Sequence, residues 1–201
     1  MNMRILAGSL VGSGGILFAL GNVLHPLEHS EAAHSAPTWE AAHLIFALGG
    51  LLIAAGLPLL IAVSQALRPS KLASIGGVVL AIAFAALAPG AWFEAYVAPL
   101  HGVAEQVEAG GGGAVNAVAG MVWMASLVAF GAGLAWRGAR RSARLAGVAL
   151  LAAALVLIVG PGLPVVEGLV IIPATVLAGL GLLAVGAASA RTTAEPVPVN
   201  A

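Results

Sequence analysis

Residues 42–66 read AHLIFALGGLLIAAGLPLLIAVSQA, a run that holds no Asp, Glu, Lys or Arg. A helix needs about 20 mainly apolar residues to cross the hydrocarbon core of a bilayer, which is roughly 30 Å thick. The run meets that length. Its glycines and its proline are tolerated in membrane helices, where small residues let backbones approach closely. The run therefore predicts one transmembrane helix.

Five further stretches have the same character, so the expected fold class is all-α, a polytopic transmembrane helix bundle with six spans. The expected spans are residues 5–24, 42–66, 72–97, 114–136, 145–166 and 169–190. They form a single transmembrane domain over residues 1–190. We expect residues 191–201, which contain Pro196 and Pro198, to be a cytoplasmic, disordered tail.

Two regions have an alternative interpretation. Residues 5–24 follow Arg4 as in a signal peptide, but their apolar run is longer than that of such a peptide, so we expect an uncleaved helix. Residues 160–167 are rich in Gly and Pro, which we expect to end one helix and turn the chain. If that region were helical instead, the last two spans would merge and the chain would have five spans.

The composition supports a membrane protein: 61% of the 201 residues are hydrophobic, 8% are charged, and the mean hydropathy is +1.06. Soluble domains carry roughly 25% charged residues. The composition therefore excludes an ordinary soluble enzyme, a disordered chain and a nucleic-acid-binding protein. The absence of Cys excludes disulfides, thiolate metal sites and covalently attached haem. The absence of Asp removes most Mg²⁺ and phosphoryl-transfer chemistry.

When the chain crosses the membrane six times, its loops alternate between the two sides, and the basic and acidic residues then separate by side. All basic residues fall on the side of the N-terminus: Arg4, Arg68, Lys71, Arg137, Arg140, Arg141, Arg144 and Arg191. Every His and all but one Glu fall on the opposite, outer side: His25, His29, His34, His43, His101, Glu28, Glu31, Glu40, Glu94, Glu105, Glu108 and Glu167. The positive-inside rule then predicts both termini in the cytoplasm (N-in/C-in) of a bacterial cytoplasmic (inner) membrane. Five spans would place Arg191 on the outer side.

The aromatic residues fit this arrangement. Trp39, Trp92 and Tyr96 fall near the outer boundary and Trp136 near the inner one, where amphipathic rings belong. Trp123 falls deeper in the fourth span, and we expect it to be a packing residue rather than a ligand contact.

The loop between the fourth and fifth spans concentrates positive charge. It contains Arg137, Arg140, Arg141 and Arg144 within eight residues. Attraction of such residues to anionic lipid headgroups contributes about 1 kcal/mol each, so membrane lipids are the expected partner. An acidic protein partner is the alternative.

The outer side brings imidazoles and carboxylates to the ends of the first three spans. His25 ends the first, Glu40 and His43 open the second, and Glu94 and His101 end the third. If helical geometry holds, spacings of three and seven residues place Glu40 with His43, and Glu94 with His101, on shared faces. Imidazole and carboxylate are the ligands that Zn²⁺, Fe and Cu(II) take when thiolates are absent. These five residues are the candidate metal site. A more specific hypothesis is a haem whose iron is bound by both His25 and His43.

Other observations favour an interpretation in which the polar residues of the outer side bind no metal and serve only the helix ends and the loop. The chain contains no HExxH string. Pro26 follows His25 and disfavours helical geometry there. Glu40 follows Thr38 at a helix start, where capping and the helix dipole alone favour an acid. A cluster of His and Glu would also titrate between about pH 5 and 7, which leaves a pH-sensing role open.

The interiors of the expected spans carry packing signals but no ionisable residue. Gly8 and Gly12 fit a close helix crossing. Pro58, Pro89 and Pro173 lie inside spans, where each predicts a kink, either static or part of a hinge. Ion-coupled carriers place ionisable groups at depth, so the chain does not fit that class.

Two short stretches carry a resemblance to a group of proteins. Gly21-Asn-Val-Leu-His25-Pro26 and Trp39-Glu-Ala-Ala-His43 resemble uncharacterised, small, six-span bacterial integral membrane proteins. The similarity covers the N-terminal third of the chain. It implies an inner-membrane protein with six spans and carries over no activity.

These observations leave three functional hypotheses. The first is an accessory or small binding protein whose outer rim holds a metal ion or haem. The second is a metal-dependent membrane hydrolase or redox enzyme with an outward-facing site. The third is a permease for a small neutral or lipid-like solute. A membrane-protein partner or a homo-oligomer fits each of them, and nucleic acid fits none.

The charge pattern makes a prediction about topology. A reporter protein fused after Ala201 should be active in its cytoplasmic form, because six spans return the chain to the side of the basic residues. The measurement compares a reporter that fluoresces only in the cytoplasm with one that is active only outside. A signal from the second reporter would contradict the six-span arrangement.

Overall fold

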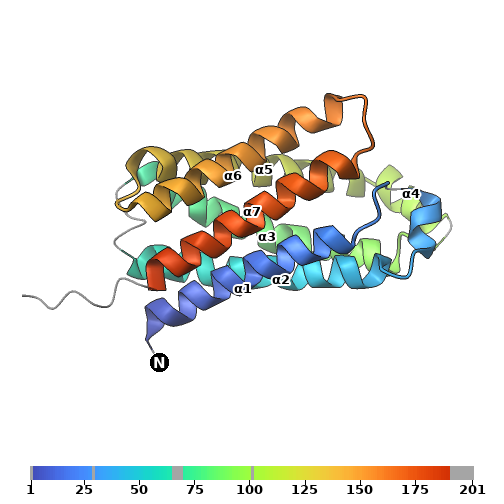
Figure 1. Cartoon of the computed structure of the whole chain (residues 1–201). Coiled ribbons are helices and arrows are strands. Elements are labelled where there is room, and N and C mark those ends of the chain that lie inside the picture. The colour runs from blue at the N-terminus through green and yellow to red at the C-terminus, as the bar shows by residue number, and fades with distance from the viewer. Residues whose placement is uncertain (1, 29, 65–69, 101, 191–201) are drawn as a thin grey trace, which may run out of the picture.

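The structure is a computed structural model that describes residues 2–28, 30–64, 70–100 and 102–190, and these parts of the chain are all-helical (Figure 1). The six long helices are α1 (Met3–Leu24), α2 (Trp39–Val63), α3 (Lys71–Tyr96), α5 (Gly112–Arg137), α6 (Arg141–Val159) and α7 (Gly168–Ala190). The shorter elements are α4 (Val103–Ala109) and two 3-10 turns, η1 (Glu31–Ser35) and η2 (Gly160–Gly162). The six long helices in the described residues are long and apolar enough to cross a membrane. The expected all-α fold class is therefore confirmed. The expected tail, 191–201, lies outside the described residues.

Most helix boundaries lie within a few residues of the expected spans, and the largest departure has a local cause. α6 ends at Val159 rather than at 166, because Gly160 begins a 3-10 turn and Pro161 has no N–H to continue the helix. Residues 145–190 are therefore not one helix. α1 ends at Leu24, and His25 is extended (φ −69°, ψ 139°), as its position before Pro26 predicts.

The sequence did not predict helix α4. Its seven residues lie between two glycines in the left-handed region, Gly102 (φ 77°) and Gly111 (φ 95°). Glycine adopts this conformation without the steric penalty that a side chain adds, so the chain can turn sharply before and after the helix. Seven residues are too few to show the apolar period of a helix.

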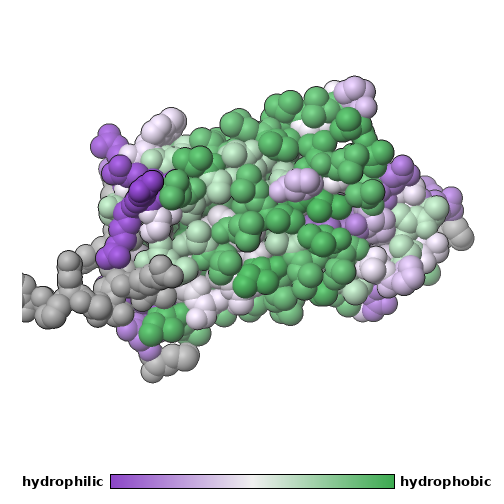
Figure 2. Space-filling model, in the orientation of Figure 1, coloured by the Kyte–Doolittle hydropathy of each residue, from purple (hydrophilic) through white to green (hydrophobic). Residues whose placement is uncertain are grey.

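The long helices form a closed ring. Each packs against its neighbours along the chain, α3 against α5, and α7 packs back against α1. The start of α1 and the end of α7 lie at the same end of the bundle, and α4 lies at the other (Figure 1). Hydrophilic residues gather at the two ends, and the face between them is mainly hydrophobic (Figure 2).

The two ends differ in the charges of their described residues. The basic end holds the start of α1 and the α5–α6 turn, with Arg4, Lys71, Arg137, Arg140, Arg141 and Arg144. The His/Glu end holds the loop from α1 to α2, the region of α4 and the start of α7, with His25, Glu28, Glu31, His34, Glu40, His43, Glu94, Glu105 and Glu167.

Aromatic side chains fill the centre of the ring. Phe18 lies 5.0 Å from Phe46 and 5.2 Å from Phe84 between ring centroids, the second pair being edge-to-face. Trp123 lies 6.0 Å from both Phe18 and Phe84. These rings come from α1, α2, α3 and α5, so one cluster ties four helices together.

Glycines set the spacing of α1 from its two neighbours. A methyl group on Gly15 would lie 2.5 Å from the carbonyl oxygen of Gly179 in α7, and one on Gly14 would lie 2.8 Å from that of Gly49 in α2. Gly8 and Gly12 face Gly186 of α7, which confirms the close crossing predicted for them. The backbones approach closely because no side chain separates them.

The prolines inside helices do not end them. Pro58, Pro89 and Pro173 lie within α2, α3 and α7, and each helix continues past its proline. Neighbouring helices and local adjustment tolerate the lost backbone hydrogen bond in membrane helices.

The glycine contacts make a prediction about stability. Gly15→Ala should destabilise the folded protein by about 1–3 kcal/mol, because the added methyl group overlaps the backbone of α7 and pushes α1 away. Gly120→Ala is the matched control, since a methyl group there meets no atom within 4 Å and favours the helix. Thermal unfolding in detergent measures both. Equal melting temperatures for Gly15→Ala and the wild type would contradict the packing account.

Candidate functional site

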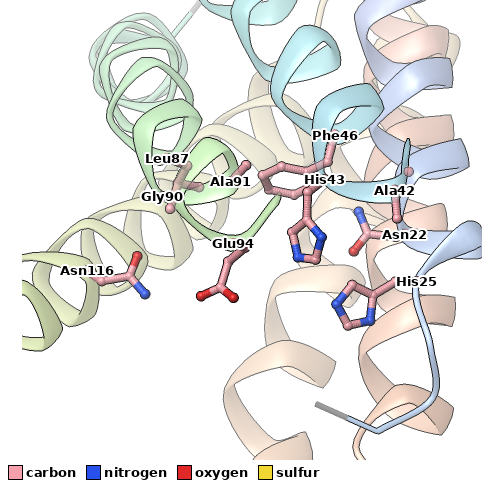
Figure 3. Close-up of a pocket in the computed structure, with 11 residues that line it drawn as sticks. Asn22, His25, Ala42, His43, Phe46, Leu87, Gly90, Ala91, Glu94 and Asn116 are labelled. Carbon is pink, nitrogen blue, oxygen red and sulfur yellow. The ribbon is translucent and has the colours of Figure 1, made fainter. Parts of the chain in front are cut away.

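A cavity of about 220 Å³ opens at the His/Glu end of the ring, and we call it the mouth. Its polar lining comes from four helices and the residue that follows α1. The polar residues are Asn22, His25, His43, Glu94 and Asn116. Figure 3 shows His25, His43 and Glu94 at the same cavity, from the end of α1, from α2 and from α3. The structure thus brings together three of the five candidate metal ligands.

The two imidazoles are in contact and are held in defined orientations. The rings of His25 and His43 lie 5.0 Å apart between centroids, at 71°. His43 Nδ1 lies 2.8 Å from the carbonyl oxygen of Trp39, and His25 Nδ1 lies 2.7 Å from that of Pro26. A carbonyl only accepts, so in the neutral form each Nδ1 carries the proton and each Nε2 is the acceptor nitrogen.

Trp39 organises this part of the site. Its side chain is 2% exposed, and its ring lies 4.3 Å from that of His43 and 5.2 Å from that of His25 between centroids. Its Nε1 donates a hydrogen bond of 2.7 Å to the carbonyl oxygen of Glu94. Trp39 therefore fixes the distance between α2 and α3 at the mouth. The sequence placed it only at the membrane boundary, since nothing along the chain relates it to a residue 55 positions later.

The structure does not bring Glu40 to the imidazoles. Glu40 is exposed and accepts a 3.0 Å hydrogen bond from the hydroxyl of Tyr96, whereas His43 is buried. His101 lies outside the described residues. Helix α3 ends at Tyr96, so the helical spacing that paired His101 with Glu94 does not reach it.

The observed arrangement bears on the metal and haem hypotheses. Among the described residues, no group of three or more His or Glu side chains is placed to hold a metal ion. A haem with two axial histidines needs the macrocycle between the imidazoles. Edge-to-face contact at 5.0 Å leaves no room for it between His25 and His43. Metal binding by this set stays a prediction from the sequence, and the two imidazoles as placed do not fit a shared haem.

A second cavity lies deeper in the ring, and we call it the chamber. Its volume is about 320 Å³, and each of the six long helices contributes to its wall. The lining residues are Phe18, Asn22, Phe46, Leu87, Gly120, Trp123, Met124, Leu157, Ile171 and Thr175. Asn22, Phe46 and Leu87 line the mouth as well, so the two cavities adjoin. The result is a polar entrance above a mainly apolar interior.

The sequence carried no signal for the chamber. Trp123 packs against Phe18 and Phe84, as expected, and also lines this cavity. The other lining residues are those of any membrane helix, and only closure of the ring brings them together.

The arginine loop connects α5 and α6. Arg137, Arg140, Arg141 and Arg144 are exposed at the basic end. Arg144 Nε donates a 2.8 Å hydrogen bond to the carbonyl oxygen of Gly138, which closes the turn between α5 and α6. The exposed guanidinium groups leave lipid headgroups as the expected contact.

The fold and site define a helical protein of multi-pass, membrane-like architecture with a cavity at one end. Comparison with known proteins finds no matching family, no matching curated protein and no matching solved structure.

The role of Trp39 makes a prediction. Trp39→Phe should destabilise the protein by about 1 kcal/mol or more, because it removes the hydrogen bond to Glu94 and shrinks a buried ring. Trp92→Phe is the matched control, since Trp92 is 56% exposed on the following helix. Thermal unfolding of the two variants should show a loss only for Trp39→Phe. Equal losses of melting temperature in the two variants would contradict the role of Trp39 in holding α2 and α3 together.

Proposed function

We propose that the protein crosses a bacterial cytoplasmic membrane six times, with the basic end in the cytoplasm and the His/Glu end outside. The support is the separation of charge along the bundle, with the described Lys and Arg residues at one end. The positive-inside rule assigns that end to the cytoplasm. The exposed arginines of the α5–α6 turn then lie at the level of anionic headgroups.

We further propose that the protein binds a small amphipathic molecule that enters from the His/Glu end. The observation that carries this proposal is the adjoining pair of cavities, with polar residues at the mouth and mainly apolar residues in the chamber. Small-molecule sites are usually concave and mostly apolar, with a few polar groups that fix orientation. The polar group of the ligand would lie at the mouth and its apolar body in the chamber.

The mouth favours a particular kind of polar group. Asn22 Nδ2 donates one hydrogen bond, of 2.8 Å, to the carbonyl oxygen of Phe18. The amide groups of Asn22 and Asn116 can each donate and accept. Among the described residues, the mouth also contains the Glu94 carboxylate and no Lys or Arg. A carboxylate or phosphate group would therefore meet negative charge without a counter-charge, whereas a hydroxyl or ammonium group suits a lining of amides, imidazoles and one carboxylate. The proposed ligand therefore carries a neutral or cationic donor group.

The half of the ring that lies between the chamber and the basic end favours a binding protein over a permease. Leu60, Phe130, Leu134 and Leu150 are fully buried there. They fill the space between the chamber and the basic end with close-packed side chains. This interpretation supports a small binding protein, which was the leading hypothesis from the sequence, with an organic ligand in place of haem.

A blocked chamber tests the proposal. The Phe side chain of Gly120→Phe would fill a large part of the chamber, whose volume is about 320 Å³. We expect this variant to bind 2-naphthylmethylamine about tenfold more weakly or not at all, since Gly120 lines the chamber. The measurement is uptake of the probe by nanodiscs that carry the protein, in excess of protein-free nanodiscs.

Val118→Phe is the matched control for Gly120→Phe. Val118 lies two residues away on α5, is 55% exposed and does not line the chamber. This variant should bind the probe like the wild type. No excess uptake by the wild type, or equal losses in the two variants, would overturn the proposed function.

A further inference from the structure

Trp123 lines the chamber and has a buried hydrogen-bonding group without a partner among the described residues. The residue is 9% exposed, and its Nε1 is buried without a hydrogen-bond acceptor in the described part of the chain. Buried donors in native proteins nearly always have a partner, and an exception calls for an explanation such as a bound molecule. An indole N–H can only donate, so its partner must be an acceptor.

The surroundings of Trp123 restrict what that acceptor can be. The rings of Phe18 and Phe84 pack against the indole. The Ser126 hydroxyl donates to the carbonyl oxygen of Trp123 at 2.8 Å, and the Thr175 hydroxyl donates to carbonyl oxygens of its own helix at 2.9 and 3.0 Å. The nearby hydroxyl protons are thus already engaged with backbone, and neither hydroxyl is placed to accept from the indole.

The absence of charged residues from the lining of the chamber gives a second restriction on the acceptor. The lining includes no Lys, Arg, Asp or Glu, and apart from Asn22 and Thr175 its side chains are apolar or aromatic. An ion would lose its hydration there without gaining a counter-charge, so a charged group does not suit this depth. A neutral oxygen costs far less to bury and can accept from the indole.

We propose that Trp123 is a specificity-determining residue that donates a hydrogen bond to a neutral oxygen on the apolar body of the ligand. The inference rests on the proposed function and names its ligand class more closely. The ligand is a small amphipathic molecule with a donor group at one end and a carbonyl or ether-type oxygen further along. Trp123 selects such a molecule over a hydrocarbon of the same shape.

Two probes of matched shape test the inference. 2-Acetonaphthone carries a ketone oxygen, and 2-isopropenylnaphthalene has a methylene group in its place. Each is measured with wild type and Trp123→Phe in nanodiscs, as uptake in excess of protein-free nanodiscs. We expect Trp123→Phe to bind the ketone about three- to tenfold more weakly, the range for one neutral hydrogen bond, and the alkene unchanged.

Spectroscopy of the wild type keeps the test independent of the variant. With ¹⁵N-labelled tryptophan, the Nε1–H resonance of Trp123 should move downfield when the ketone is added and stay in place with the alkene. Trp39 provides an internal reference, because its Nε1 already donates to Glu94.

The outcomes separate the inference from the proposed function. If neither probe binds to the wild type, the binding function itself fails. If both bind and Trp123→Phe weakens them equally, or if the Trp123 resonance responds alike to both, the chamber binds ligands but Trp123 acts only by packing. An unchanged affinity of Trp123→Phe for the ketone would likewise overturn the inference, as expected if a water molecule satisfies the indole.

Discussion

The close approach of α1 to both of its neighbours is the contact on which the rest of the structure depends. Lipid gives apolar helices no hydrophobic reason to associate, so packing and hydrogen bonds must hold the bundle. Gly14 meets Gly49 of α2, and Gly15 meets Gly179 of α7, on adjacent positions of one helix. The second contact joins the last helix to the first, and all six long helices of the resulting ring line the chamber.

The site follows from where α1 ends. Pro26 favours the extended conformation of His25, so α1 ends there, and the imidazole contacts α2. His43 meets it there, oriented by the carbonyl oxygen of Trp39. The same indole binds the backbone of Glu94 on α3. Three helix ends are thus held at one opening by a proline and a tryptophan.

The sequence predicted the parts of this structure that depend on local properties. Hydropathy located the six long helices, and the rule for residues before proline placed His25 correctly. The chamber, the tie from Trp39 to Glu94 and the separation of Glu40 from the imidazoles depend on how helices rotate about their axes. In helices this uniformly apolar, most faces look alike, so no periodic pattern marks the one that turns inward.

The donors and acceptors of the two cavities imply an orientation for the proposed ligand. The mouth is lined by the amides, imidazoles and carboxylate of Asn22, Asn116, His25, His43 and Glu94, and Trp123, whose Nε1 has no acceptor among the described residues, lines the chamber. A molecule with a polar donor head and an oxygen on its body suits both cavities when the head stays at the mouth. Reversed, it would bury its head in apolar surroundings and leave the indole without an acceptor, a penalty of about 1–3 kcal/mol for each buried group without a partner. Polarity alone therefore distinguishes the two ends of the ligand, without any charged residue in the lining of the chamber.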